Sequence, residues 1–142
     1  MKALNADTLN SHDYKGYTPL ILAVYNDQPE AVKYLLSQGV DVDAKDNSGN
    51  TAMMGAAFKG FVTYVRLMLD AGALVNIKNY NDATALTFAA TFGREEIAKI
   101  LIEHGADSDI KDAYGNSPLD YAQNQGNDSM AALLNSHKRA DK

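Results

Sequence analysis

The sequence predicts an all-α solenoid of four 33-residue helix–turn–helix repeats with projecting β-turn loops. The 142-residue chain lines up with itself when it is shifted by 33 positions, and such a period is typical of stacked-repeat proteins. Within each copy, apolar residues recur at helical spacing in two segments. Hydrophobic residues make up 46% of the chain and charged residues 22%, so a core can form and wholesale disorder is disfavoured.

The repeat is marked by hydroxyl, small and glycine residues that each return after 33 positions. The hydroxyls are Thr18, Thr51, Thr84 and Ser117, the small residues are Ala23, Ala56, Ala89 and Ala122, and the glycines are Gly39, Gly72 and Gly105. This period predicts an N-terminal extension or truncated cap over residues 1–12, and repeats over 13–45, 46–78, 79–111 and 112–142, the last serving also as the C-terminal cap.

The first helix of each copy is predicted from its start signal. In the first copy Thr18 suits an N-cap and Pro19 suits the first helical position. Leu20, Ala23 and Val24 then follow at helical spacing.

A second helix follows in the same copy. Pro29 opens it, Val32, Leu35 and Leu36 form its apolar stripe, and Gly39 suits a left-handed C-cap. Residues 40–49 are polar and turn-rich, which predicts a projecting loop before the next copy.

The motifs that carry these signals resemble a known family. The segments are DYKGYTPL at residues 13–20, LIEHGAD at 101–107 and DAYGNSPL at 112–119. With two short helices and a projecting turn at this period, they resemble the ankyrin repeat, and the short chain is similar in style to small stand-alone bacterial ankyrin-repeat proteins. Ala52 and Ala85 replace the proline of the pattern, and Asp82 replaces the turn glycine. Aspartate tolerates a positive φ better than most residues, so we expect that turn to form.

The two ends of the chain are expected to differ. The fourth copy carries Gln123, Asn135 and Lys138 where the others carry apolar residues or glycine, as suits a polar C-terminal cap. Residues 1–12 are too few for a capping helix pair, so we expect Leu20, Val24 and Val32 to face solvent or another chain. Either upstream residues are missing or this N-terminal face self-associates, and the sequence leaves both alternatives open.

The resemblance implies a concave binding surface made of the turn tips and the outer part of each first helix. Aromatic residues mixed with Asn and Ser are typical of binding surfaces. The expected partner-binding residues are Tyr14, Tyr17, Tyr25, Asn47, Asn50, Phe58, Tyr80, Phe92 and Tyr114. The competing interpretation is that these aromatics pack on neighbouring copies and shield the stack. Phe61 and Tyr64 are expected to lie partly exposed on the convex side as a further apolar patch.

Charge and missing motifs exclude several classes of function. Thirteen Lys and Arg against eighteen Asp and Glu give a net charge of −5, which disfavours binding to nucleic acid and to anionic membranes. There is no cysteine, hence no thiolate nucleophile. Ser, His and Asp do not converge by any spacing, and no G-x-x-x-x-G-K loop occurs. His12, His104 and His137 lack a converging third ligand. We therefore expect no catalytic, cofactor or metal site.

These observations predict a non-catalytic protein–protein interaction module that presents its concave surface to a folded partner, as a regulator, inhibitor or accessory factor. The alternative is a structural protein that self-associates through the N-terminal face; an enzyme or small-molecule binder is disfavoured. We expect a monomer or a weak homodimer. No apolar run reaches signal-peptide or bilayer-spanning length, so the chain as written is expected in the cytoplasm, or in the periplasm if a signal peptide was removed.

Overall fold

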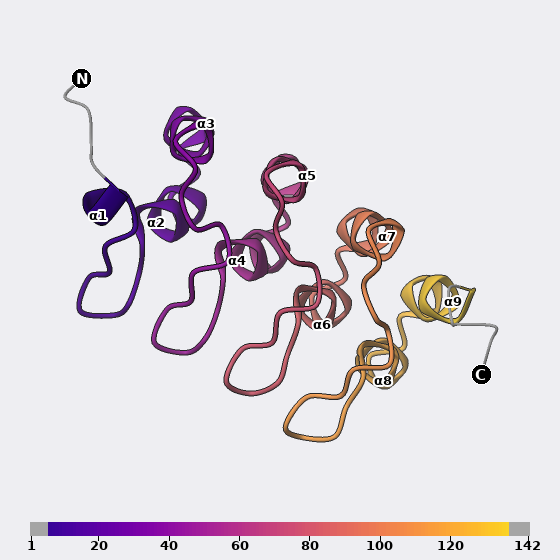
Figure 1. The fold of residues 1–142 in the computed structure, drawn as a ribbon. Helices are drawn as coiled ribbons and strands as arrows, with labels where there is room; N and C mark the ends of the chain where they lie inside the picture. The colour runs from indigo at the N-terminus through magenta and orange to yellow at the C-terminus, as the bar shows by residue number, and fades with distance from the viewer. Residues whose placement is uncertain (1–5, 137–142) are drawn as a thin grey trace.

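The computed structural model describes residues 6–136, and these form short helices joined by turns, without a strand among them (Figure 1). The helices are α1 (Ala6–Leu9), α2 (Pro19–Tyr25), α3 (Pro29–Ser37), α4 (Ala52–Lys59), α5 (Val62–Asp70), α6 (Ala85–Thr91), α7 (Glu95–Glu103), α8 (Pro118–Asn124) and α9 (Asp128–Ser136). The all-α class is confirmed. His137 and Lys138 lie outside the described residues.

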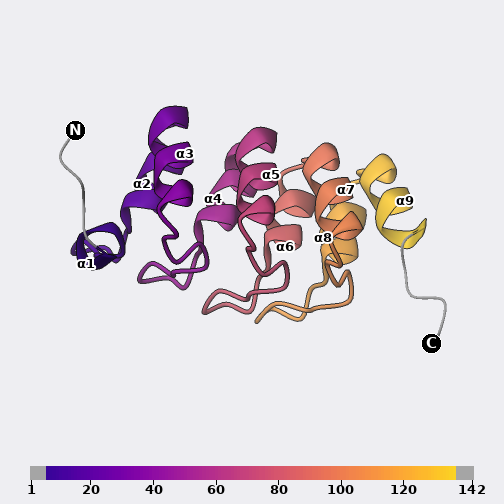
Figure 2. The same cartoon turned by 45° about the horizontal axis from the view of Figure 1, so that its top comes forward.

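The helices after α1 are arranged in two rows. In Figure 1, α2, α4, α6 and α8 form an inner row, and α3, α5, α7 and α9 form an outer row on the side away from the projecting loops. Each inner helix packs on the outer helix that follows it and on the next inner helix. The loops that precede α4, α6 and α8 project from the same side of the stack (Figure 2). This is the helix–turn–helix solenoid that the period predicted, and the residue boundaries of its copies stay a prediction.

Each inner helix begins at the predicted hydroxyl. The side-chain oxygens of Thr18, Thr51, Thr84 and Ser117 accept hydrogen bonds from backbone N–H groups three residues later, at 3.2–3.3 Å. These bonds satisfy donors that a helix start otherwise leaves unpaired, which accounts for the spacing of the hydroxyls in the sequence.

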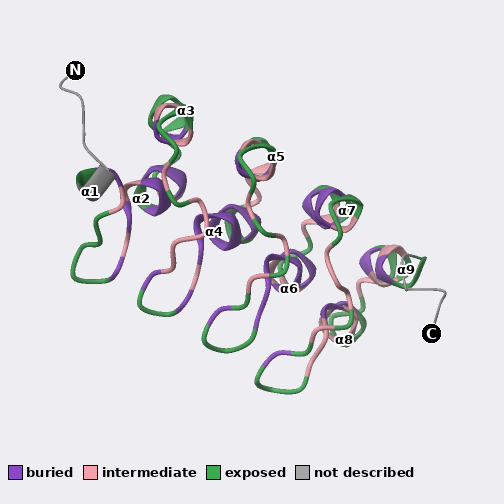
Figure 3. Cartoon of the chain, in the orientation of Figure 1, coloured by how far each residue is buried: buried purple, intermediate pink, exposed green. Residues whose placement is uncertain are grey.

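The core runs between the two rows for the length of the stack. Figure 3 shows α2, α4 and α6 as mostly buried, α8 as less buried, and the outer helices as buried on one side. Ala56, Ala89 and Ala122 are fully buried on α4, α6 and α8, where a larger side chain would push neighbouring inner helices apart. Small and large apolar residues of the inner row therefore pack with the aliphatic side chains of the outer row in one continuous core.

The N-terminal end corrects one expectation. Leu20, Val24 and Val32 were expected to face solvent or another chain, but all three are buried within the single chain. The reason is that α1, although far shorter than a helix pair, places Leu9 in the same core, while α3 and α4 cover the other sides of α2. On α2 the large apolar side chain that stays exposed is Leu22, at 37%.

Candidate binding groove

Each projecting turn is organised by the Asp or Asn at its start. The Oδ1 atoms of Asp13, Asp46, Asn79 and Asp112 each accept hydrogen bonds from the backbone N–H groups two and four residues later, at 2.8–3.1 Å. Two bonds to one oxygen hold the backbone of the turn, so the side chains at its tip are free to project.

Neighbouring turns are tied to one another by their backbones. The N–H groups of Asn47, Tyr80 and Ala113 donate to the carbonyls of Lys15, Ser48 and Asn81, at 3.2, 3.1 and 2.8 Å. Gly49 shows how closely the turns approach, because a Cβ added there would lie 2.6 Å from the backbone nitrogen of Tyr80. Asp82 takes the corresponding position of the next turn at a φ of 62°, and that turn forms as expected.

Two of the expected binding residues also link adjacent turns. The Asn47 side chain donates to the carbonyl of Tyr14 at 3.1 Å. The Asn50 side chain accepts from the amide of Asn79 at 2.8 Å. Both amides therefore hold the array of turns together, whatever a partner does with them.

The concave surface, defined here as the turn tips together with the exposed ends of the inner helices, carries a line of aromatic residues. Tyr14, Tyr80 and Tyr114 at the tips are 86%, 67% and 78% exposed. The Nζ of Lys45 lies 5.5 Å from the centre of the Tyr80 ring, which orients that ring by a cation–π contact. Large exposed rings on a rigid support are what a protein partner can bury.

Phe58 and Phe92 meet at the ends of α4 and α6. Their ring centres lie 4.8 Å apart in an edge-to-face arrangement, and both rings remain partly exposed. Arg94 lies behind them, where its Nη2 donates to the carbonyl of Phe58 at 3.0 Å. The two helix ends thus form one apolar contact area.

Tyr17 and Tyr25 are more enclosed. Their ring centres lie 5.9 Å apart, and the Tyr25 ring lies against Gly55 of α4, where an added Cβ would be 3.1 Å from it. Burial, followed by the charge of Asp46, raises the pKa of Tyr25 above its usual value. For Tyr25 the packing role that the competing interpretation expected is therefore present.

A groove of about 230 Å³ opens between the third and fourth helix pairs, α6/α7 and α8/α9. Its walls are Asn79, Asn81, Ala83, Thr87, Phe88, Thr91, Phe92, Asp112, Tyr114 and Tyr121. The Tyr121 hydroxyl donates to Oδ2 of Asp112, and this bond, with burial, raises the pKa of Tyr121. A second groove of about 280 Å³ lies at the first two turns, bordered by Tyr14, Tyr17 and Asn47.

Several groove residues were missed by the sequence analysis, chiefly Phe88 and Tyr121. They occupy the position at which the earlier copies hold Leu22 and Gly55. This position is aromatic only in the last two copies. A comparison of the four copies at this position could therefore have indicated that these residues belong to the groove.

The expected convex patch at Phe61 and Tyr64 is partly wrong. Tyr64 is only 3% exposed, and its ring points inward, with its hydroxyl donating to Asp27 at 2.6 Å. Phe61 is half-buried with its ring edge-to-face with that of Tyr64, at 5.5 Å between centres. The stacking of the first two helix pairs draws the Tyr64 ring into the space between them.

Among residues 6–136, no three His, Asp or Glu side chains gather closely enough to hold a metal ion. His104 ends α7, and its Nδ1 lies 2.8 Å from the carbonyl of Ile100. None of the helices in the described range is long and apolar enough to cross a membrane.

Stacked pairs of short helices, with tied turns and a groove along the inner row, define a helical repeat protein with an extended surface. The family model for ankyrin repeats in three copies matches residues 2–79 and 74–142. The chain therefore belongs to the ankyrin-repeat family, whose members are generally protein–protein interaction modules and typically non-catalytic. A comparison with curated proteins gave no match.

Proposed function

We propose that the chain binds a folded protein partner through its concave surface and acts as a regulator, inhibitor or accessory factor of that partner. The observation that carries this proposal is the line of exposed aromatics along one side of the stack. Tyr80, Phe92 and Tyr114 stand at or beside the groove between α6 and α8.

The rigidity of the turns supports this function. Backbone hydrogen bonds within and between the turns hold the concave surface in place before a partner arrives. A preorganised surface loses little conformational entropy on binding, so more of the contact energy appears as affinity. The grooves are open, so they can contact the surface of a protein, whereas a small substrate requires an enclosed site.

The test uses exposed residues only, so that folding is preserved. Tyr80→Ala, Phe92→Ala and Tyr114→Ala combined should weaken binding to a partner captured from the source lysate by about a hundredfold or more, because buried aromatic anchors dominate interface energies. The captured protein is identified by mass spectrometry, and its affinity is measured by calorimetry.

The matched control is Leu74→Ala, which truncates an exposed apolar residue that borders none of the grooves described above. It should bind the partner like wild type, and all variants should remain folded and unfold in one cooperative transition. A partner held equally well by the triple variant would contradict the concave-surface proposal.

The alternative function is self-association through the N-terminal face. The partial exposure of Leu22 favours this alternative. The equivalent residue of the second copy, Gly55, faces Tyr25 of the preceding copy. On α2 no helix pair precedes that position within the described residues.

A further inference from the structure

The junction between the first two helix pairs, α2/α3 and α4/α5, differs from the later junctions in three neighbouring positions. The loop after the inner helix holds Asp27 in the first pair, where the later pairs hold Gly60, Gly93 and Gly126. The residue that follows this loop position is Phe61 in the second pair, where the next two pairs hold Arg94 and Asn127. Tyr64 likewise stands where the next two pairs hold Ile97 and Met130.

At the next junction a polar side chain fills the gap between the loops. Arg94 reaches back over Gly60, where an added Cβ would lie 3.1 Å from its Cζ, and donates to the carbonyl of Phe58. At the junction after that, Asn127 lies over Gly93 in the same way, 3.6 Å from where a Cβ would stand. The chain thus has its own pattern of a basic or amide side chain in this place.

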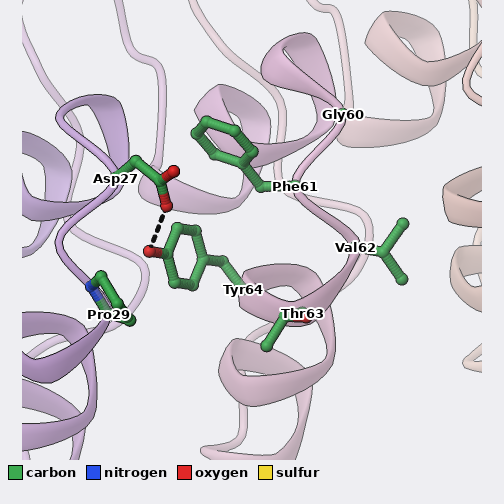
Figure 4. A pocket seen from close by; sticks show the side chains of 7 residues that line it. All are labelled: Asp27, Pro29, Gly60, Phe61, Val62, Thr63 and Tyr64. Carbon is green, nitrogen blue, oxygen red and sulfur yellow. Dashed lines mark hydrogen bonds between the residues drawn. The ribbon is translucent and has the colours of Figure 1, made fainter.

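At the first junction none of the described residues places a basic or amide side chain over the loop in this way. The ring of Phe61 turns toward Tyr64, and a pocket of about 340 Å³ remains (Figure 4). Asp27 and Pro29 line one side of the pocket, and Phe61, Val62 and Tyr64 line the other. The pocket is therefore mostly apolar, with one carboxylate at its edge.

The Asp27 carboxylate has a fixed position at the edge of the pocket. The φ of Asp27 is 53°, in the left-handed region that aspartate tolerates better than most residues, and the three later pairs hold glycine here. The hydroxyl of Tyr64 fixes the carboxylate at 2.6 Å, and burial together with Asp27 keeps that hydroxyl protonated by raising the pKa of Tyr64 to about 12.

The electrostatics of the helix ends are compatible with a cation here. The starts of α3 and α5 carry partial positive charge, which by itself disfavours one. Arg94 nevertheless occupies the N-cap of α7, with Glu95 and Glu96 in the first turn of that helix. At the first junction the single carboxylate that lines the pocket is that of Asp27, and Glu30 lies in the first turn of α3, outside the pocket lining.

We propose that the pocket between Asp27 and Tyr64 binds an arginine side chain of a protein partner. The guanidinium pairs with the Asp27 carboxylate, and the planar group and its aliphatic stem pack against the Phe61 ring. The pocket lies at the loops that follow the inner helices, so it is a second contact beyond the concave surface.

The test is an NMR titration of the isotope-labelled chain with a capped Gly-Arg-Gly peptide. Saturable shifts should appear at residues 27–30 and 60–64, and a capped Gly-citrulline-Gly peptide, which is neutral but similar in shape, should produce none. Asp27→Asn removes the charge and keeps a residue that tolerates a positive φ, and it should weaken binding by about fivefold. Asp82→Asn makes the same change at the other left-handed aspartate and should leave affinity unchanged.

Three results would overturn the proposal: shifts confined to other residues, equal binding of the citrulline peptide, or equal affinity of the Asp27→Asn variant. Equal affinity for a Gly-Lys-Gly peptide would overturn the assignment to arginine. The triple variant of the concave surface leaves the pocket intact and should bind the arginine peptide like wild type, so the two proposals fail separately.

Discussion

At the residue scale, the Asp27–Tyr64 pair makes a pH-dependent contribution to stability. The pKa of Tyr64 is raised from 10.0 to about 12 by burial and by the hydrogen bond and charge of Asp27. The folded chain thus holds this proton more tightly than the unfolded chain. The stabilisation is complete below pH 10 and is lost as the pH rises through about 12.

Tyr64→Phe removes this contribution, so the melting temperature of wild type should exceed that of the variant at neutral pH. The difference should shrink between pH 10 and about 12, as followed by circular dichroism melts. Tyr14→Phe, at a highly exposed turn tip, is the control and should match wild type throughout. A difference that stays constant up to about pH 12 would contradict the assigned role of the pair.

Single residues whose role depends on their near neighbours could be predicted from the sequence. Thr18 caps α2 through an amide three residues away, and Asp82 adopts the left-handed backbone expected of it. The partnership of Asp27 with Tyr64 could not be predicted, because it joins residues 37 positions apart. This contact depends on how α5 stacks against the preceding loop, and the sequence does not reveal that stacking.

At the element scale, α6 is enclosed by three neighbours, since it packs on α4, α7 and α8. Ala89 is fully buried at its centre. Ala89→Asp should lower the free energy of unfolding by several kcal/mol, because an unpaired charge would be buried there. This is a large share of the roughly 5–15 kcal/mol of a typical domain.

Urea unfolding followed by circular dichroism measures the effect. Gln123→Asp places the same charge on the exposed side of α8, and its effect should stay within about 0.5 kcal/mol. An Ala89→Asp variant that unfolds at the same urea concentration as wild type would refute the packing register of the inner row.

Elements were more predictable than the contacts between them. Caps, prolines and apolar spacing mark where the helices begin, and α2 and α3 begin at Pro19 and Pro29 as expected. The links between turns were not foreseen, because the partners of Asn47 and Asn50 lie in the neighbouring copies. The groove depends in the same way on Phe88 and Tyr121, which become neighbours only in the stack.

At the scale of the whole molecule, the alternative of self-association concerns the N-terminal face. Its core side chains are covered, and Leu22 on α2 remains partly exposed. A stable interface buries about 800 Å² on each partner, far more than one leucine offers. We therefore expect sedimentation velocity to show one species at the chain mass of 15.4 kDa over a wide range of concentration.

Leu22→Gln tests the alternative directly. Because Leu22 is already partly exposed, the variant should keep the stability of wild type within about 0.5 kcal/mol. A doubled mass in wild type that Leu22→Gln abolishes would support self-association through this face and contradict the monomer.

The overall stack could be predicted from the sequence because each copy repeats the same local rules and touches only its neighbours. The N-terminal end could not, because no periodic signal describes residues 1–12. The small number of these residues led to the expectation that the N-terminal face is uncovered. That face is in fact covered, because Leu9 lies in the core.

The bonds that join neighbouring turns run through backbone atoms at three successive contacts. The side chains of Tyr14, Tyr80 and Tyr114 consequently contribute little to the contacts that hold the turns together. Under the proposed function, exchange of these rings would alter what the molecule recognises while its scaffold persists, so that specificity would change by single substitutions without a compensating change elsewhere. Recognition would then evolve largely independently of the maintenance of the fold.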